Sequence, residues 1–342
     1  MTNFVHSTHS LDLQTGGVIE AVHRLNDELL KALKTSRISK KPTFSKDEYL
    51  IAHGLWQWPS YQAWKNFKKT GVPYIVFPHG MLDPWFKKTY PFKHLKKQCY
   101  WWWRQGAILR DAHAVCFTTE EERLLAQKTF FPYQCNEVVT GLGVATPPGD
   151  PARQVALFHE RLPQVKNKKV LLYLGRFHPK KGVDMLINSF LKDRGREDIL
   201  LLAGPTEKPD SFLKSLMKQA SGKENQIIWS GMLEGDLKWG ALLAADSLIL
   251  PSHQENFGMV IAEALSVGTP VLLTDKVNLW REVVDSNAGM VANDDQAGID
   301  QLVQQWRNGA HVSCIKNTIS CFREKLHISK TVDNIISLFP KE

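Results

Sequence analysis

Short, continuous apolar runs alternate along this chain with segments whose apolar residues recur at helical spacing. Buried strands of a parallel sheet produce such runs, because helices cover both faces of the sheet. The predicted strands are residues 4–8, 49–53, 74–78, 114–118 and 137–140 in the first half, and 170–175, 199–204, 227–231, 247–251 and 270–274 in the second. The pattern therefore predicts an α/β protein with two doubly wound, Rossmann-like domains that face one another across a cleft.

A Pro- and Gly-rich segment without periodicity, residues 145–153, separates the two sets of strands. It divides the chain into an N-terminal domain, residues 1–146, and a C-terminal domain, residues 147–328. Ligands of open parallel sheets bind at the carboxyl ends of the strands. The polar motifs of this chain follow predicted strands, which indicates one shared site.

Two glutamates eight positions apart, Glu255 and Glu263, flank the point where a predicted strand gives way to a helix beginning at Met259. The segment between Glu255 and this helix comprises Asn256, Phe257 and Gly258. The free N–H groups and the dipole of a helix start favour an anion such as phosphate. Carboxylates would repel that anion, but they can accept hydrogen bonds from hydroxyl groups. A ligand with a diphosphate between two polyols is a nucleotide sugar; the alternative is an acid at a helix start and a solvated glutamate.

Two cations lie in a corresponding place in the preceding stretch, LLYLGRFHPKKGVDMLINSF. Arg176 follows an apolar strand, and Lys181 opens the next predicted helix. A planar guanidinium fork and a mobile ammonium group both suit a diphosphate. The alternative is a solvated basic turn, but the acid pair some 75 residues further along favours the nucleotide-sugar interpretation.

These motifs together resemble family 4 of the retaining glycosyltransferases, the glycosyl transferases group 1, of bacterial type. The resemblance rests on G-R-x4-K-G and E-N-F-G-M-x3-E, with A-G-P and S-G-M-L between them. Residues 10–18, 53–60 and 78–85 resemble the matching N-terminal segments of family members. The resemblance covers nearly the whole chain and implies the GT-B fold.

The resemblance implies a role for each motif residue. Arg176 and Lys181 would stabilise the departing diphosphate in place of a metal ion, Glu255 would hold the donor sugar, and His79 would touch that sugar from the N-terminal domain. The implied donor-binding residues are Gly16, Gly17, Asn256, Phe257, Gly258, Met259, Glu263, Gly204, Pro205, Gly231, Met232 and Leu233. No metal site is expected, because no Asp-x-Asp motif occurs. His53 and Asp83 are weaker candidates for a contact with the reacting sugar. The alternatives are a structural histidine at position 79, a tight turn at Gly16 and Gly17, and a simple strand-end turn at the nucleobase positions.

Two architectural expectations also follow from the resemblance. The last helix, within residues 329–342, would pack back on the N-terminal domain. Only some 14 residues separate the first predicted helix, 18–34, from the strand at 49–53, where family members usually have another strand and helix. We therefore expect a smaller N-terminal sheet.

Cysteine usage and hydropathy indicate the compartment in which the protein works. Five cysteines without metal-ligand spacing and the absence of a recognisable secretory signal predict reduced thiols in a cytoplasmic protein. No apolar stretch approaches 18 residues, so no membrane-spanning helix is expected.

Residues 85–104 contain eight aromatic residues, six Lys or Arg and no acid. The candidate membrane or acceptor patch comprises Trp85, Lys87, Lys88, Lys93, Lys96, Lys97, Trp101, Trp102 and Trp103. Aromatic rings and cations together suit an anionic membrane surface on the inner face of the plasma membrane. The alternatives are aromatic residues that fill the core beside solvated lysines, and a single-stranded nucleic acid, for which no binding-module pattern is present.

The sequence therefore predicts a retaining, metal-independent hexosyltransferase that uses a UDP-, GDP- or ADP-linked sugar. Its acceptor would be a glycan or a lipid-linked glycan of cell-envelope or exopolysaccharide assembly. A nucleotide-sugar epimerase of the same fold and a non-catalytic nucleotide-sugar-binding module are the alternatives.

Overall fold

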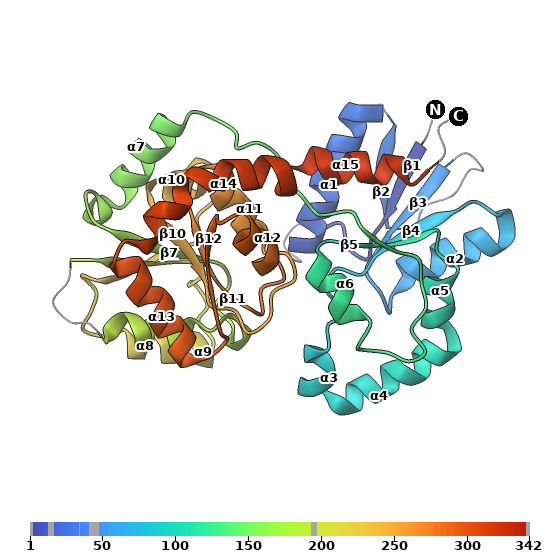
Figure 1. Ribbon diagram of the computed structural model, residues 1–342, viewed down its shortest axis with the longest axis horizontal. Helices are drawn as coiled ribbons and strands as arrows, with labels where there is room; N and C mark the ends of the chain where they lie inside the picture. Colours follow the sequence, from blue (N-terminus) through green and yellow to red (C-terminus); the bar gives the residue numbers. More distant parts are fainter. Residues whose placement is uncertain (1–2, 13–16, 34, 41–47, 193–196, 340–342) are drawn as a thin grey trace. The chain divides into compact units, whose positions relative to one another are not determined.

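The computed structural model describes residues 3–12, 17–33, 35–40, 48–192 and 197–339 (Figure 1). The chain forms two compact units, one made of Met1–Ala145 with Leu326–Glu342 and the other of Thr146–Lys325. Each unit contains a six-stranded parallel sheet. Within the described ranges, each helix is too short or too polar to cross a bilayer.

The sheet of the first unit has the strand order β2-β1-β3-β4-β5-β6. Its strands are β1 Asn3–Ser7, β2 Ser36–Ser39, β3 Glu48–His53, β4 Tyr74–Phe77, β5 Ala114–Phe117 and β6 Glu137–Val139. Its helices are α1 Gly17–Leu33, α2 Trp58–Thr70, α3 Trp85–Thr89, α4 Pro91–Tyr100, α5 Gly106–Arg110, α6 Glu120–Ala126 and α15 Ile328–Ser337, with a π-helical turn at Trp101–Gln105. The chain reverses its direction of winding between β1 and β3, which makes this the switch point of the sheet.

The two faces of this sheet carry separate apolar clusters. Helix α15 belongs to the cluster that also contains α1, because its Val332 and Ile335, with Phe339 just after the helix, pack among Phe4 and Leu25. Figure 1 shows α15, in red, running beside α1. The last helix therefore packs on the N-terminal sheet and completes the core there.

The sheet of the second unit has the strand order β12-β11-β10-β7-β8-β9, with its switch point between β7 and β10. Its strands are β7 Val170–Leu174, β8 Ile199–Ala203, β9 Ile227–Gly231, β10 Ser247–Leu250, β11 Val271–Thr274 and β12 Gly289–Ala292. Its helices are α7 Pro151–Arg161, α8 Val183–Leu191, α9 Ser211–Gln219, α10 Gly235–Ala244, α11 Met259–Ser266, α12 Trp280–Asp285, α13 Gln296–Arg307 and α14 Ile315–Cys321. Shorter turns of 3₁₀-helix lie at Pro163–Val165, Pro179–Lys181 and Ala310–Cys314, and a π-helical turn at Phe322–Leu326.

All ten predicted strands are present, and two further strands, β2 and β12, were not predicted. Both are four-residue edge strands: β2 reads SRIS and is polar, and β12 reads GMVA, a short run that begins at a glycine. β2 lies in the short interval after α1 and gives this sheet six strands. The expectation that the sheet is smaller than in family members stays a prediction.

Candidate functional site

The loop between β7 and α8 is pressed against the end of β10 in the second unit. Gly182 has a positive φ of 63°, and a Cβ atom there would lie 2.1 Å from the carbonyl oxygen of Pro251. Only glycine accepts both constraints. His253 N–H donates to the carbonyl of Lys180 over 2.8 Å, which joins the same two segments. The residues that follow β7 and β10 therefore meet at the switch point of the sheet.

Lys181 and Glu255 form an ion pair at this point, and both side chains are largely buried. The backbone of Glu255 is fixed from the other side, because its N–H donates to Lys276 and its carbonyl accepts from Asn278. The ammonium group therefore lies next to a carboxylate whose backbone is held in the loop after β10. The ion pair itself was not predicted.

Arg176 lies at the same edge of the sheet. The Tyr173 hydroxyl donates to the Arg176 carbonyl over 2.7 Å, and burial together with the nearby Glu255 carboxylate raises the pKa of Tyr173. The Arg176 side chain is exposed and lines a pocket with Phe177 and Pro205. Burial and the charges of Lys180 and Arg176 lower the pKa of neighbouring His178. The same pocket also contains Lys208 and the acids Glu207 and Asp210, so the accessible guanidinium lies among charges of both signs.

The start of helix α11 provides backbone donors. Gly258 has a φ of 66° and precedes Met259, the first helical residue, while Phe257 is buried beneath the turn. Asn256 Oδ1 accepts from Asn278 Nδ2 over 3.2 Å. The positive end of α11 thus lies directly beside Glu255 in sequence, as the anion-site prediction requires.

Glu263 has a partner that the sequence did not indicate. Its carboxylate, almost completely buried on α11, accepts from the Lys238 ammonium of α10 over 2.9 Å. Lys238 also lies 4.9 Å from the centre of the Trp239 ring. Lys238 occurs inside a helical segment with no recognisable motif, so no sequence signal identified it.

The glycines predicted for the nucleobase pocket lie side by side at the ends of β8 and β9. Gly204 N–H donates to the Gly231 carbonyl over 3.0 Å, and a Cβ on Gly204 would lie 2.1 Å from the Gly175 carbonyl oxygen. Met232 is exposed after this turn, whereas Leu233 is buried. These residues form a close-packed strand-end surface next to Arg176.

A histidine–aspartate pair was also missed. His253 Nδ1 and Asp294 Oδ1 are 2.5 Å apart, and this hydrogen bond raises the pKa of His253. His253 follows β10 by three residues, so its place at a strand end could have identified it.

The predicted site residues of the first unit lie after β4 and at the start of α1. His79 follows β4 with a φ of 50°, and His53 Nδ1 lies 2.9 Å from His79 Nε2. Asp83 is buried and accepts from the backbone N–H of Trp85, the first residue of α3, over 2.7 Å. Gly17 opens α1, and Gly16 lies outside the described residues.

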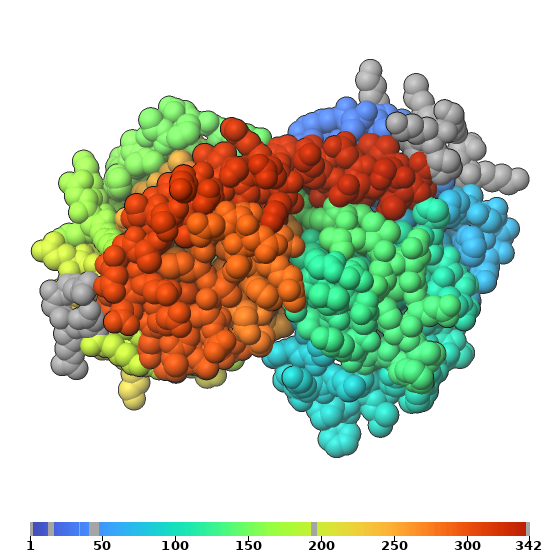
Figure 2. Space-filling view, in the orientation of Figure 1, coloured from blue at the N-terminus to red at the C-terminus, as the bar shows by residue number. Residues whose placement is uncertain are grey.

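The aromatic patch divides into buried and exposed members. Trp101 is buried, stacks on Phe130 with the ring centroids 4.8 Å apart, and donates to the Pro132 carbonyl. Its assignment to a surface patch is wrong, because the helix phase turns this one indole into the core. Trp102 and Trp103 are 62% and 68% exposed. Figure 2 shows the segments of α3 and α4, in teal, at the lower edge of the first unit.

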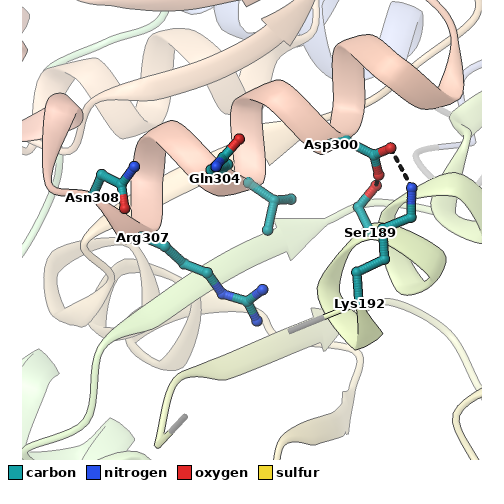
Figure 3. A pocket seen from close by; sticks show the side chains of 7 residues that line it. Ser189, Lys192, Asp300, Gln304, Arg307 and Asn308 are labelled. Carbon is teal, nitrogen blue, oxygen red and sulfur yellow. Dashed lines mark hydrogen bonds and ion pairs between the residues drawn. The ribbon is translucent and has the colours of Figure 1, made fainter. Parts of the chain in front are cut away.

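A pocket between α8 and α13 lies away from the predicted site. In Figure 3, Asp300 accepts from Ser189 and Lys192 on one side of this pocket, and Arg307 lies on the other. Arg307 pairs with Asp198, which immediately precedes β8, so the pocket lies at the amino ends of the strands. Its charged groups pair with one another, which favours a structural role.

Comparison with known proteins agrees with this architecture. The family profile described as "Glycosyl transferases group 1" matches residues 155–318, and the "Glycosyl transferase 4-like domain" profile matches residues 45–140. The structure of Anabaena HepE in complex with UDP-glucose has a TM-score of 0.75 at 15% identity, with 99% of each chain covered. Sucrose-phosphate synthase from Thermosynechococcus elongatus has a TM-score of 0.75 at 16% identity, with 98% of each chain covered.

Two parallel six-stranded sheets and these structural neighbours define a GT-B-fold protein. The two profiles match in different units, and the chain belongs to the family 4 glycosyltransferases, the glycosyl transferases group 1. D-inositol 3-phosphate glycosyltransferase of Frankia alni is 29% identical over 224 residues, 60% of this chain. The chain spans 37% and 54% of the lengths of the first two curated relatives that it matches.

Proposed function

We propose that this protein is a retaining glycosyltransferase that moves a sugar from a nucleotide-diphosphate sugar to a glycan or lipid-linked acceptor. The observation that carries the proposal is the Lys181–Glu255 pair at the switch point of the second sheet. A diphosphate would attract the ammonium group, and the carboxylate would then accept hydrogen bonds from sugar hydroxyls. The UDP-glucose complex of HepE, a neighbour in fold, supports a nucleotide sugar as the donor.

The proposed chemistry is substitution on one face of the donor sugar. The bond between the anomeric carbon and the phosphate oxygen breaks, and the acceptor oxygen bonds to that carbon from the same side. The leaving phosphate oxygen takes the acceptor's proton. Arg176 and Lys181 stabilise the charge that develops on the diphosphate, so the reaction requires no metal ion. His79 contacts the donor sugar from the N-terminal unit.

The test is incubation of the purified protein with a panel of UDP-, GDP- and ADP-sugars, with and without membrane extract, while free nucleotide is measured. Release that requires acceptor, persists in EDTA and gives a product with retained anomeric configuration supports the proposal. Interconversion of the sugar without acceptor indicates an epimerase instead. Binding without turnover indicates a non-catalytic module.

We further propose that helix α4 and the following turn contact an anionic membrane that carries the acceptor. Phe92, Leu95 and Trp102 recur at helical spacing, and they are 84%, 60% and 62% exposed. An apolar face directed toward solvent on a helix with no buried residue and no acid suits the headgroup region of a bilayer. This contact would place the protein at the inner face of the plasma membrane, in envelope or exopolysaccharide assembly.

A small pocket beside this helix supports an acceptor that carries an anionic group. Lys93, Lys97 and His94 line it together with the rings of Phe86, Tyr90 and Phe130. The Lys97 ammonium lies 4.9 Å from the centre of the Trp56 ring and 5.9 Å from that of Phe86. Partial burial and the charge of Lys93 lower the pKa of Lys97. A phosphate in this pocket would relieve the repulsion between the two ammonium groups.

A further inference from the structure

Three histidines form a continuous hydrogen-bonded chain at the switch point of the first sheet. His6 Nδ1 lies 2.9 Å from His53 Nε2, and His53 Nδ1 lies 2.9 Å from His79 Nε2. His6 is in β1, His53 ends β3, and His79 follows β4, so one residue comes from each of three adjacent strands. Neighbouring rings are nearly parallel, with centroids 5.2 Å apart in both pairs.

All three imidazoles are held in the neutral form. Burial lowers the pKa of His6 to about 3 and that of His79 to about 4, and the pKa of His53 also lies well below its ordinary value. His23 of α1 contributes to the lowered pKa of His6. The buried carboxylate of Glu122 accepts hydrogen bonds from the backbone N–H of Gly80 and from the N–H and hydroxyl of Thr118. A neutral imidazole has a single N–H, so each ring donates from one nitrogen and accepts at the other.

The inner end of the chain fixes its direction. His6 Nε2 is buried and has no hydrogen-bond partner among the described residues. A proton on this nitrogen would be an orphaned buried donor, which is rarer in proteins than an unsatisfied acceptor. His6 therefore carries its proton on Nδ1 and donates to His53 Nε2. His53 must then donate from Nδ1 to His79 Nε2, and the proton of His79 is on Nδ1.

From this geometry we infer that His53 and His6 are positioning residues that fix His79 as a neutral hydrogen-bond donor, with its Nδ1–H available to an oxygen atom of the substrate. His79 cannot act as a general base in this arrangement, because its outward nitrogen already carries the proton. Its left-handed backbone conformation, uncommon for a residue other than glycine, is a strain typical of functional positions. The catalytic consequence rests on the proposed glycosyltransferase function, whereas the tautomer does not.

Long-range ¹H–¹⁵N spectra of the ¹⁵N-histidine-labelled protein read the tautomer directly, with His79 assigned from its own substitution. We expect His79 to be neutral and protonated on Nδ1 between pH 6 and 8. Protonation on Nε2, or a charged ring at pH 7, would overturn the inference. The NMR result does not depend on turnover. If the protein used no nucleotide sugar, the proposed function would be refuted, but the spectra would still decide the tautomer of His79.

Two isosteric substitutions test the positioning role. His53→Asn keeps an amide donor where Nδ1 now lies, whereas His53→Asp presents only an acceptor once it is ionised. We expect His53→Asn to stay within about threefold of wild-type kcat, and His53→Asp to lose roughly tenfold, the effect of one hydrogen bond. His53→Asp should also move the His79 proton to Nε2 and bring its titration toward neutral pH. Equal losses of kcat in the two folded variants would refute the inference. Thermal unfolding and nucleotide binding establish that both variants are folded.

Discussion

The ammonium group of Lys181 and the carboxylate of Glu255 form an ion pair across the switch point of the C-terminal sheet, although 74 positions separate them in the sequence. The close approach of Gly182 to Pro251 brings their segments together. A bound diphosphate would compete with Glu255 for the ammonium group. Binding of the donor would therefore also release a carboxylate for the sugar hydroxyls.

Lys181→Ala and Arg176→Ala should each lower kcat by roughly 10²–10³-fold, the usual effect of removing one group that stabilises developing charge. Steady-state kinetics with the donor found in the nucleotide-sugar panel would measure this loss. Lys192→Ala is the matched control, because it removes the same charge from an ion pair at the opposite end of the sheet. Near-normal turnover of either variant at the site would contradict the assignment of these cations.

The ion pair between Lys238 and Glu263 should contribute to the stability of the protein. Lys238→Met should destabilise the protein by about 1–3 kcal/mol, because a buried carboxylate loses a charged partner. Adding Glu263→Gln should recover part of that loss, since the buried carboxylate charge is then removed. Calorimetry of the single and double variants gives the coupling energy. Strictly additive effects would indicate that the pair contributes nothing to stability.

Glu263→Ala should raise the KM for the donor more than it lowers kcat, because the resemblance implies that Glu263 binds the donor and gives it no role at the reacting atoms. Initial rates over a range of donor concentrations test this. An unchanged KM with a reduced kcat would instead place Glu263 close to the reacting atoms.

Most of the fold could be predicted because buried parallel strands are readable as apolar runs, and their carboxyl ends locate the motifs. Lys181 and Glu255 were predicted as site residues in this way, and the structure brings them together. Lys238 could not be found, because it follows no strand and only the packing of α10 beside α11 brings it to Glu263. An ion-pair partner that tertiary packing brings from another helix leaves no signal in the sequence around either residue.

The tryptophan run illustrates a second limit. Trp101, Trp102 and Trp103 are identical in type and consecutive, so composition cannot separate them. The phase of the helix decides that Trp101 stacks on Phe130 and that its two neighbours face solvent. His6 was overlooked for a related reason, because a histidine within an apolar strand gives no indication of which side chains it meets.

The proposed membrane contact of α4 can be tested by substituting two neighbouring lysines, Lys96 and Lys97. Lys97→Met should reduce binding to vesicles that contain anionic lipid more than Lys96→Met does, because Lys97 lines the pocket and Lys96 does not. Trp102→Ala should weaken binding further by removing an exposed aromatic ring from the interface. Cosedimentation with anionic and neutral vesicles measures these effects. Equal, weak binding of all variants to both vesicle types would rule out the proposed membrane contact.

The buried histidines predict how the N-terminal unit responds to acid. The folded-state pKa values of His6 and His79, about 3 and about 4, lie below the ordinary value of 6.5. The unfolded chain therefore binds more protons than the native protein below about pH 6.5, and stability must fall as the pH falls through this range. Each group contributes a slope of up to about 1.4 kcal/mol per pH unit between its two pKa values.

His6→Asn removes one of these groups and should make the acid dependence of this unit shallower by about one proton. Scanning calorimetry between pH 7 and 5 would follow the unfolding transition of the N-terminal unit separately if the two units unfold independently. His9→Asn, at an exposed position close by in the sequence, is the matched control for the substitution itself. A His6→Asn slope equal to that of wild type would mean that His6 is already charged in the folded protein, which the direction inferred for the histidine chain does not allow.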